Sequence, residues 1–141
     1  MTRVAFVLLA LLGACAGEPV AEAPILPGTA TVALGETARF GSLAVTPLRV
    51  EEDSRCPVSV QCVHAGTVRI AIRTSDSGAG RDLELTLGTP VSLGGAWLTL
   101  AAACPYPGVP GPIRQSAYRF NLVVGQQPAS PRHQACPGPA A

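Results

Sequence analysis

The sequence predicts an all-β protein, a small antiparallel β-sandwich or barrel of about six to eight strands stapled by disulfides. Short stretches alternate apolar and polar residues with a period of two, and no segment of about ten residues carries a helical apolar stripe. The chain contains 15 glycines and 14 prolines, which place turn signals at intervals of roughly ten residues. These patterns leave sandwich and barrel as alternatives, because only strand pairing separates them.

The folded part is expected to begin near Thr29, and the first strand that we can place surrounds Pro47. Apolar and polar residues alternate in Leu43–Thr46 and again in Leu48–Val50, on either side of this proline. Because proline has no backbone N–H to donate, it predicts an edge strand or a bulge at this point.

The clearest alternation in the chain lies in Thr67–Arg73. The three β-branched aliphatic residues of this stretch are predicted to face the core, and its two arginines are predicted to face water. The inward set is Val68, Ile70 and Ile72, and the outward set is Arg69 and Arg73.

Four further strands complete the predicted domain. The segment Asp82–Leu87 alternates with Leu83, Leu85 and Leu87 inward, after the turn-rich connection Ser75–Gly80. A two-residue hairpin turn at Gly94-Gly95 joins Pro90–Leu93 to Ala96–Leu100. The last strand buries alternate residues, namely Tyr118, Phe120, Leu122 and Val124.

The N-terminal residues carry the features of a secretory signal. Arg3 precedes an apolar run, Val4–Leu12, which is too short to span roughly 30 Å of hydrocarbon as a helix. The following tetrapeptide, Leu12-Gly13-Ala14-Cys15, resembles the lipobox of bacterial lipoproteins. The resemblance implies removal of residues 1–14 and lipidation of Cys15, and Ala16 in place of Asp resembles the pattern sorted to an outer membrane. Ordinary cleavage, with Cys15 left unmodified, is the alternative.

The rest of the chain is expected to form one domain between two irregular segments. Residues 15–28 are rich in Ala and Pro and are expected to form a flexible tether. Residues 29–125 are expected to form the β-domain, and residues 126–141 a Pro-rich tail that is attached to the domain through Cys136. Without Arg3, nine arginines balance nine Asp and Glu residues, and no basic cluster is present. This balance argues against nucleic acid as a partner.

Four cysteines remain once Cys15 is assigned to the lipid. An even number in an exported chain favours two disulfides, and four cysteines allow three connectivities. We favour Cys56 with Cys62 and Cys104 with Cys136, each stabilising the fold by roughly 2 to 4 kcal/mol. The crossed pairings, which close longer loops, stay open at this point.

The segment Asp53–Gly66, which reads DSRCPVSVQCVHAG, concentrates the unusual residues. It resembles a group of small bacterial exported proteins and lipoproteins with a motif of the form DSRCP, then QC, V, an aromatic residue and AG. The resemblance continues more weakly into Thr67–Arg73, the hairpin at Gly95 and Pro105–Pro107. It implies a disulfide-containing β-domain and no particular reaction. His64 departs from the group, which usually has Trp there.

Physical reasoning on the same residues predicts a stapled loop between two strands. Asp53 is suited to accept backbone N–H bonds in an Asx-type turn. Arg55 is suited to a bidentate contact with Asp53, Glu51 or Glu52. Gly66 permits a sharp turn into the strand that begins at Thr67.

Two chemical alternatives use the same loop. Cys56, Cys62 and His64 have soft-ligand chemistry that suits copper(I) or zinc in a metal- or redox-handling lipoprotein, although an oxidising compartment favours the disulfide. A small hydrolase would need Ser54 or Ser59 with His64 and Asp53, but no nucleophile-elbow pattern is present. We therefore expect no catalytic residues, no metal and no cofactor.

Three aromatic residues remain as contact candidates, namely Trp97, Tyr106 and Tyr118. Trp97 is expected in the core or over a disulfide, whereas Tyr106 lies in the stiff, Pro-rich stretch Cys104–Pro112. The candidate interaction residues are therefore Asp53, Arg55 and Tyr106. The sequence as a whole predicts a non-catalytic, lipid-anchored domain, facing the periplasm from the outer membrane, that binds or stabilises another envelope component.

Overall fold

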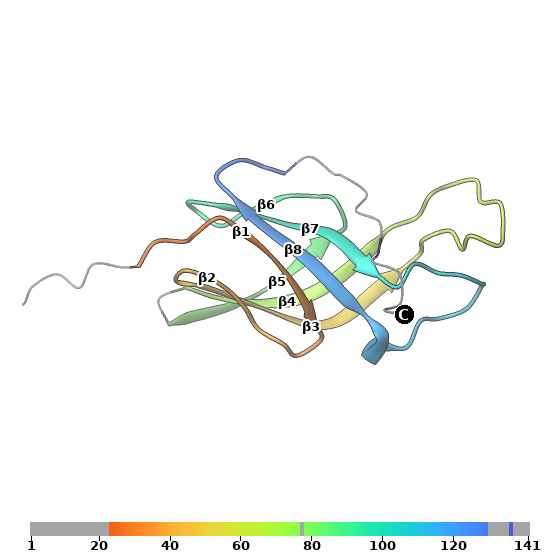
Figure 1. The fold of residues 1–141 in the computed structure, drawn as a ribbon, viewed down its shortest axis with the longest axis horizontal. Helices are drawn as coiled ribbons and strands as arrows, with labels where there is room; N and C mark the ends of the chain where they lie inside the picture. The colour runs from red at the N-terminus through yellow and green to blue at the C-terminus, as the bar shows by residue number, and fades with distance from the viewer. Residues whose placement is uncertain (1–22, 77, 130–135, 137–141) are drawn as a thin grey trace, which may run out of the picture.

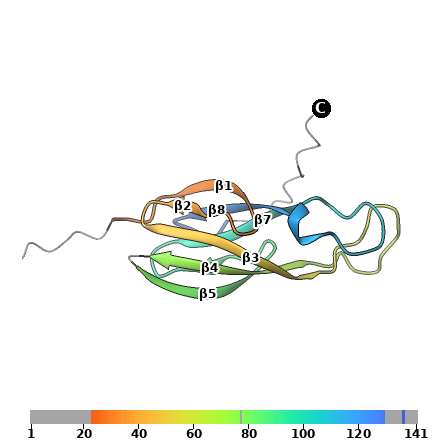
Figure 2. The same ribbon diagram turned by 90° about the horizontal axis from the view of Figure 1, so that it is seen from below.

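The computed structural model describes residues 23–76, 78–129 and 136. Within these residues the chain forms two four-stranded antiparallel sheets, with the orders β1-β8-β7-β6 and β2-β3-β4-β5 (Figures 1 and 2). The predicted all-β class is confirmed, and of the two architectures the sandwich is the one observed. The elements are β1 (Gly28–Ala33), β2 (Ala38–Phe40), β3 (Leu43–Asp53), β4 (Val68–Asp76), β5 (Ala79–Thr86), β6 (Val91–Ser92), β7 (Trp97–Cys104), the 3-10 helix η1 (Gln115–Ala117) and β8 (Arg119–Gly125).

Several sequence predictions concern residues outside this description. They are the signal segment 1–14, the lipidated Cys15, the first part of the tether and most of the Pro-rich tail, residues 130–135 and 137–141. No helix in the described ranges is both long and apolar enough to cross a membrane.

The core lies between the two sheets and follows the predicted alternation. In β4, Val68, Ile70 and Ile72 are fully buried, while Arg69 and Arg73 point outward and form ion pairs with carboxylates of neighbouring strands. Fully burying a side chain of this size stabilises the fold by about 1.5 to 3 kcal/mol. Leu85 is likewise fully buried, whereas Leu83 in β5 and Leu87 just after it are only partly covered.

The last strand also buries the residues that the sequence predicts. The buried residues Phe120, Leu122 and Val124 alternate along β8, with Tyr118 immediately before it. Trp97 is only half-buried, at the first residue of β7, while Cys104 is the last residue of the same strand. Because a strand rises about 3.3 Å per residue, Trp97 lies too far from Cys104 to cover its disulfide, so that part of the expectation is wrong.

Pro47 lies in an inner strand, so the edge-strand alternative is wrong for β3 as a whole. However, β2 pairs only with the first three residues of β3, Leu43–Val45, and leaves Pro47 without a strand neighbour on that side. A register shift between Pro47 and Arg49 shows the bulge that the proline predicts. The missing N–H is therefore placed where it costs no ladder hydrogen bond.

Both predicted hairpins are present, and the chain before them is more ordered than expected. The Leu93 N–H donates to the Ala96 carbonyl at 2.8 Å across Gly94-Gly95. The end of the expected tether is attached to the sheet, because the Leu26 N–H donates to the Phe40 carbonyl at 3.0 Å and Ile25 forms a bridge with Gly41. The flexible tether therefore cannot extend as far as residue 28.

Two connections project together from one end of the sandwich. They are the β3–β4 connection, residues 54–67, and the β7–β8 connection, residues 105–118. The described chain begins at the opposite end, as both ribbon views show (Figures 1 and 2).

Candidate functional site

Two disulfides hold the end of the sandwich from which the connections project. Cys56 is bonded to Cys62 and Cys104 to Cys136, with Cα–Cα distances of 5.9 Å and 5.4 Å. These distances are normal for disulfides. The favoured pairing is confirmed, and Cys136 attaches its segment to the last residue of β7 as the sequence predicts.

The β3–β4 connection starts as a narrow neck. The Ser54 N–H donates to the Thr67 carbonyl at 2.8 Å, and the Cys56 N–H donates to the Ala65 carbonyl at 3.1 Å. These bonds continue the antiparallel pairing of β3 and β4 beyond the strand ends. The loop that the Cys56–Cys62 disulfide closes is therefore attached to the sheet by hydrogen-bonded backbone.

Asp53 and Arg55 form a nearly buried ion pair at the base of this neck. The Arg55 side chain is 4% exposed, and its Nε and Nη2 donate to the Asp53 Oδ1 and Oδ2 at 2.9 Å and 2.6 Å. The Arg55 N–H also donates to Asp53 Oδ1, at 3.2 Å, which is the predicted Asx turn. Of the three carboxylates that the sequence left open, Arg55 pairs with Asp53, while Glu51 pairs with Arg49 and Glu52 with Arg69.

The same guanidinium joins the two connections to each other. Arg55 Nη1 donates to the Ala103 carbonyl and Nη2 donates to the Pro105 carbonyl at 3.0 Å. The guanidinium carbon lies 5.2 Å from the centre of the Tyr106 ring, within the range of a cation–π contact. One side chain from the first connection therefore fixes the start of the second.

Tyr118 completes the cluster from the far end of the second connection. Its hydroxyl donates to Asp53 Oδ2 at 2.7 Å, and its ring stacks on Phe120 with centroids 5.7 Å apart. Burial raises the pKa of the Asp53 carboxyl, but the hydrogen bonds from Arg55 and Tyr118 outweigh burial and hold that pKa below its usual value. The sequence predicts Tyr118 as a core residue and a contact candidate, but it does not predict the bond to Asp53, because the two residues are 65 positions apart.

The Tyr118 phenol is expected to titrate far into the alkaline range. Burial and the hydrogen bond to the Asp53 carboxylate raise the pKa of Tyr118 to about 12, from 10.0. The pKa of Tyr118 is higher in the folded state than in the unfolded state, so the protonated phenol stabilises the fold. This stabilisation is complete below pH about 10 and is lost as the pH rises through about 12. Phenolate absorbance measured against pH should show this late step, and Tyr118→Phe should remove it. An unchanged titration curve in the variant would contradict the assignment.

A groove of about 510 Å³ separates the end of β3 from the β7–β8 connection. Backbone contact closes one end, where the Val58 N–H donates to the Pro107 carbonyl at 3.1 Å. At the other end, the Gln115 side-chain amide accepts from the Val50 N–H at 2.9 Å and donates to the Val50 carbonyl at 3.0 Å. Gln115 thus takes the place of a neighbouring strand along β3.

The polar side chains that line the groove bond within the chain itself. Glu51, Glu52 and Asp53 pair with arginines, and the Ser54 hydroxyl exchanges hydrogen bonds with the Thr67 backbone. Prolines and Ile113 line the opposite wall. Such a set of contacts holds two connections in fixed positions.

The structure does not bring together the residues considered for metal binding or for hydrolysis. Cys56 and Cys62 are bonded to each other, and His64 is exposed on the loop between them and β4. The described residues contain no group of three or more His, Cys, Asp or Glu arranged to hold a metal ion. Asp53 bonds to Arg55 and Tyr118, and Ser54 to Thr67, so these two groups are engaged elsewhere than in a triad with His64.

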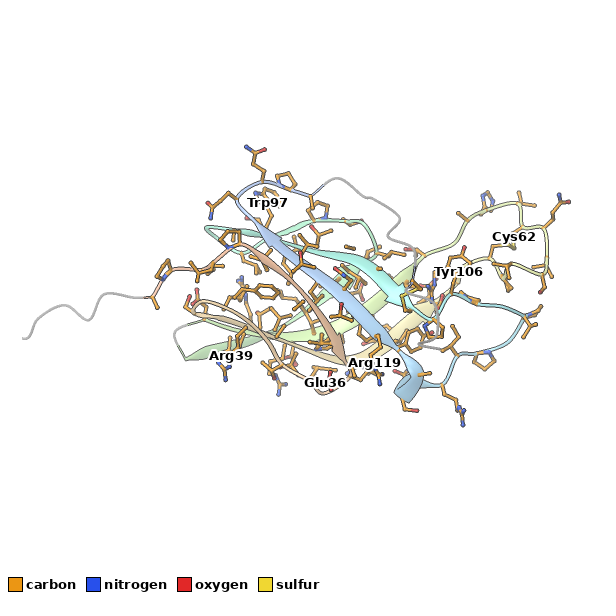
Figure 3. All side chains as sticks on the ribbon, viewed as in Figure 1. Glu36, Arg39, Cys62, Trp97, Tyr106 and Arg119 are labelled. Carbon is orange, nitrogen blue, oxygen red and sulfur yellow. A yellow bond between two sulfur atoms is a disulfide. The ribbon has the colours of Figure 1, made fainter. Side chains whose placement is uncertain are left out.

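Exposed apolar side chains gather on the two connections. Of the six large hydrophobic residues that are exposed in the described ranges, five lie here, and Val63 is the most open at 94%. Residues 56–66 and 104–113 contain no Asp, Glu, Lys or Arg. We call this set the loop surface; it consists of Val58, Val60, Val63, Tyr106 and Val109. Figure 3 shows Cys62 and Tyr106 at this end and Arg39 toward the other.

Among the candidate interaction residues, only Tyr106 belongs to the loop surface. Asp53 and Arg55 lie beneath it and support the two connections. The valines of the loop surface were not predicted as contact residues. The signal that marks them in the sequence is the lack of charge in two turn-rich runs, PVSVQCV and PGVPGPI.

The chain was compared with protein-family models, with curated proteins and with solved structures. None of them matches. The resemblance of Asp53–Gly66 to a group of exported bacterial proteins therefore stays an expectation from the sequence.

Proposed function

We propose that this chain is a lipid-anchored lipoprotein of the bacterial cell envelope whose β-sandwich is a non-catalytic binding domain. The observation that carries the proposal is the loop surface, where five of the six exposed large hydrophobic side chains of the described residues gather. Exposed apolar side chains that concentrate at one end of a domain mark an interaction site more often than scattered apolar residues do.

The contacts beneath the loop surface support binding in preference to catalysis. Catalysis needs a base or a nucleophile that is free to reach a substrate, whereas the Asp53 carboxylate is saturated by Arg55 and Tyr118. Binding benefits from surfaces whose shape is fixed in advance, because less conformational entropy is lost on association. The disulfide, the ion pair and the prolines fix these connections in that way.

The anchor is proposed from the N-terminal sequence. Leu12-Gly13-Ala14-Cys15 provides the lipidation motif, and each buried methylene of an attached chain contributes about 0.8 kcal/mol to membrane binding. Two or three long acyl chains therefore give stable anchoring. With Ala16 after the cysteine, we propose attachment to the outer membrane on its periplasmic side.

The anchor is tested by Cys15→Ser in the full chain. The wild type is expected to be in the membrane fraction and to incorporate labelled palmitate, whereas Cys15→Ser should incorporate none. Glu18→Gln, a change in the tether, is the matched control and should be labelled like the wild type. Palmitate labelling of Cys15→Ser, or an unlabelled wild type, would contradict the proposed anchor.

A further inference from the structure

We propose that the loop surface docks into an apolar, uncharged recess of another envelope protein. This inference deepens the proposed binding function and rests on it. The recess is expected to receive the side chains of both connections at once, because the two connections form one braced unit.

The charge distribution determines the chemistry of the partner. All five side chains of the loop surface are uncharged, and residues 56–66 and 104–113 contribute no formal charge. Charged residues lie elsewhere, for example in the ladder of Glu52, Arg69 and Glu84 on the outer face of the second sheet. Charged side chains in a partner's recess would lose their hydration on binding and would gain no ion pair with the loop surface. A complementary recess is therefore apolar.

The shape of this end determines that the partner is concave. The two connections extend beyond the strands and lie side by side in both ribbon views (Figures 1 and 2). The Val58–Pro107 hydrogen bond and the Arg55 contacts hold them together. The two connections therefore form one projection, which fits a recess and buries little area against a flat or convex surface.

A second copy of the chain fits this geometry poorly. Contact between two loop surfaces would bring the projecting ends of two domains together, and two convex surfaces would exclude little water.

A lipid surface fits the residue types poorly. Side chains that settle at membrane interfaces are Trp, Tyr, Lys and Arg, and the loop surface has one tyrosine and four valines. The end of the domain that lies nearest to the proposed anchor is also the other end. The favoured occupant is therefore a protein.

The experiment uses a photo-crosslinking amino acid at position 63 of the full, lipidated chain in intact cells, with position 39 as the matched control. Both positions are exposed. Cys62, the neighbour of position 63 in the chain, and Arg39 lie toward opposite ends of the domain (Figure 3). Position 63 is expected to give one protein adduct of discrete mass that position 39 does not give. Val58→Asp should reduce its yield about tenfold, while Val58→Ile should retain it. The yield should not fall as salt is raised, because no ion pair is involved.

The other outcomes each overturn the inference. An adduct of twice the mass of the chain would identify a second copy, and flotation of purified Cys15→Ser domain with phosphatidylethanolamine–phosphatidylglycerol vesicles would identify a lipid surface. A protein adduct from position 39 but not from position 63 would overturn this placement and leave the proposed binding function standing. No adduct from either position would contradict both, independently of acyl labelling at Cys15.

Discussion

Arg55→Met is expected to lower the free energy of unfolding by about 3 to 5 kcal/mol, the cost of leaving one partner of a buried ion pair alone. The Asp53 carboxylate would lose the guanidinium that donates to both of its oxygens. The carbonyls of Ala103 and Pro105 would lose a donor as well. Denaturant unfolding of the folded domain measures the change.

Arg73→Met is the matched control for this prediction. Arg73 also makes a two-point contact with a carboxylate, that of Asp82, but the two side chains are 58% and 56% exposed. Exposed pairs contribute about 1 kcal/mol or less, so this variant should remain close to the wild type. Equal losses in the two variants would show that the buried cluster does not hold the connections.

Gly66→Ala is expected to destabilise the domain by about 3 to 5 kcal/mol, from steric overlap together with left-handed strain. Gly66 has a φ of +68°, and a Cβ at this position would lie 1.7 Å from the Ser54 carbonyl oxygen. That oxygen belongs to the backbone of the neck and cannot rotate away. The variant must therefore open the neck or distort the loop that the Cys56–Cys62 disulfide closes.

Gly35→Ala separates the two causes. Gly35 has a similar φ of +79°, but a Cβ there would meet nothing within 4 Å. It should lose only the conformational part, about 1 kcal/mol. Thermal or denaturant unfolding compares the two variants, and a Gly66→Ala domain as stable as Gly35→Ala would contradict the close approach at the neck.

The elements with a strong alternation could be predicted because one face of each strand is fully buried. The core positions of β4 and β8 follow directly from that pattern. The sequence does not predict the bounds of β1 and β2. The strand β2 has only three residues, and β1 alternates Ala and Thr, which differ little in polarity. Period-two patterning needs several consecutive residues to rise above chance.

Whether a contact in the candidate site could be predicted depends on how far apart its two residues lie in the sequence. The Asp53–Arg55 contact and the Cys56–Cys62 disulfide join residues close in the chain, so turn chemistry and spacing predict them. The contacts of Arg55 with Ala103 and of Tyr118 with Asp53 join residues 48 and 65 apart, and they depend on how the two sheets stack. Sequence patterns do not encode that stacking, so the sequence suggested Arg55 as a contact residue, whereas the structure buries it as a support.

Crosslinking from position 109 tests whether the two distant connections form one docking surface. Val63 and Val109 belong to different connections and are both exposed. Position 109 is expected to capture the same protein as position 63, and Val58→Asp is expected to diminish both adducts. Different proteins from the two positions, or an adduct from position 63 alone, would contradict it.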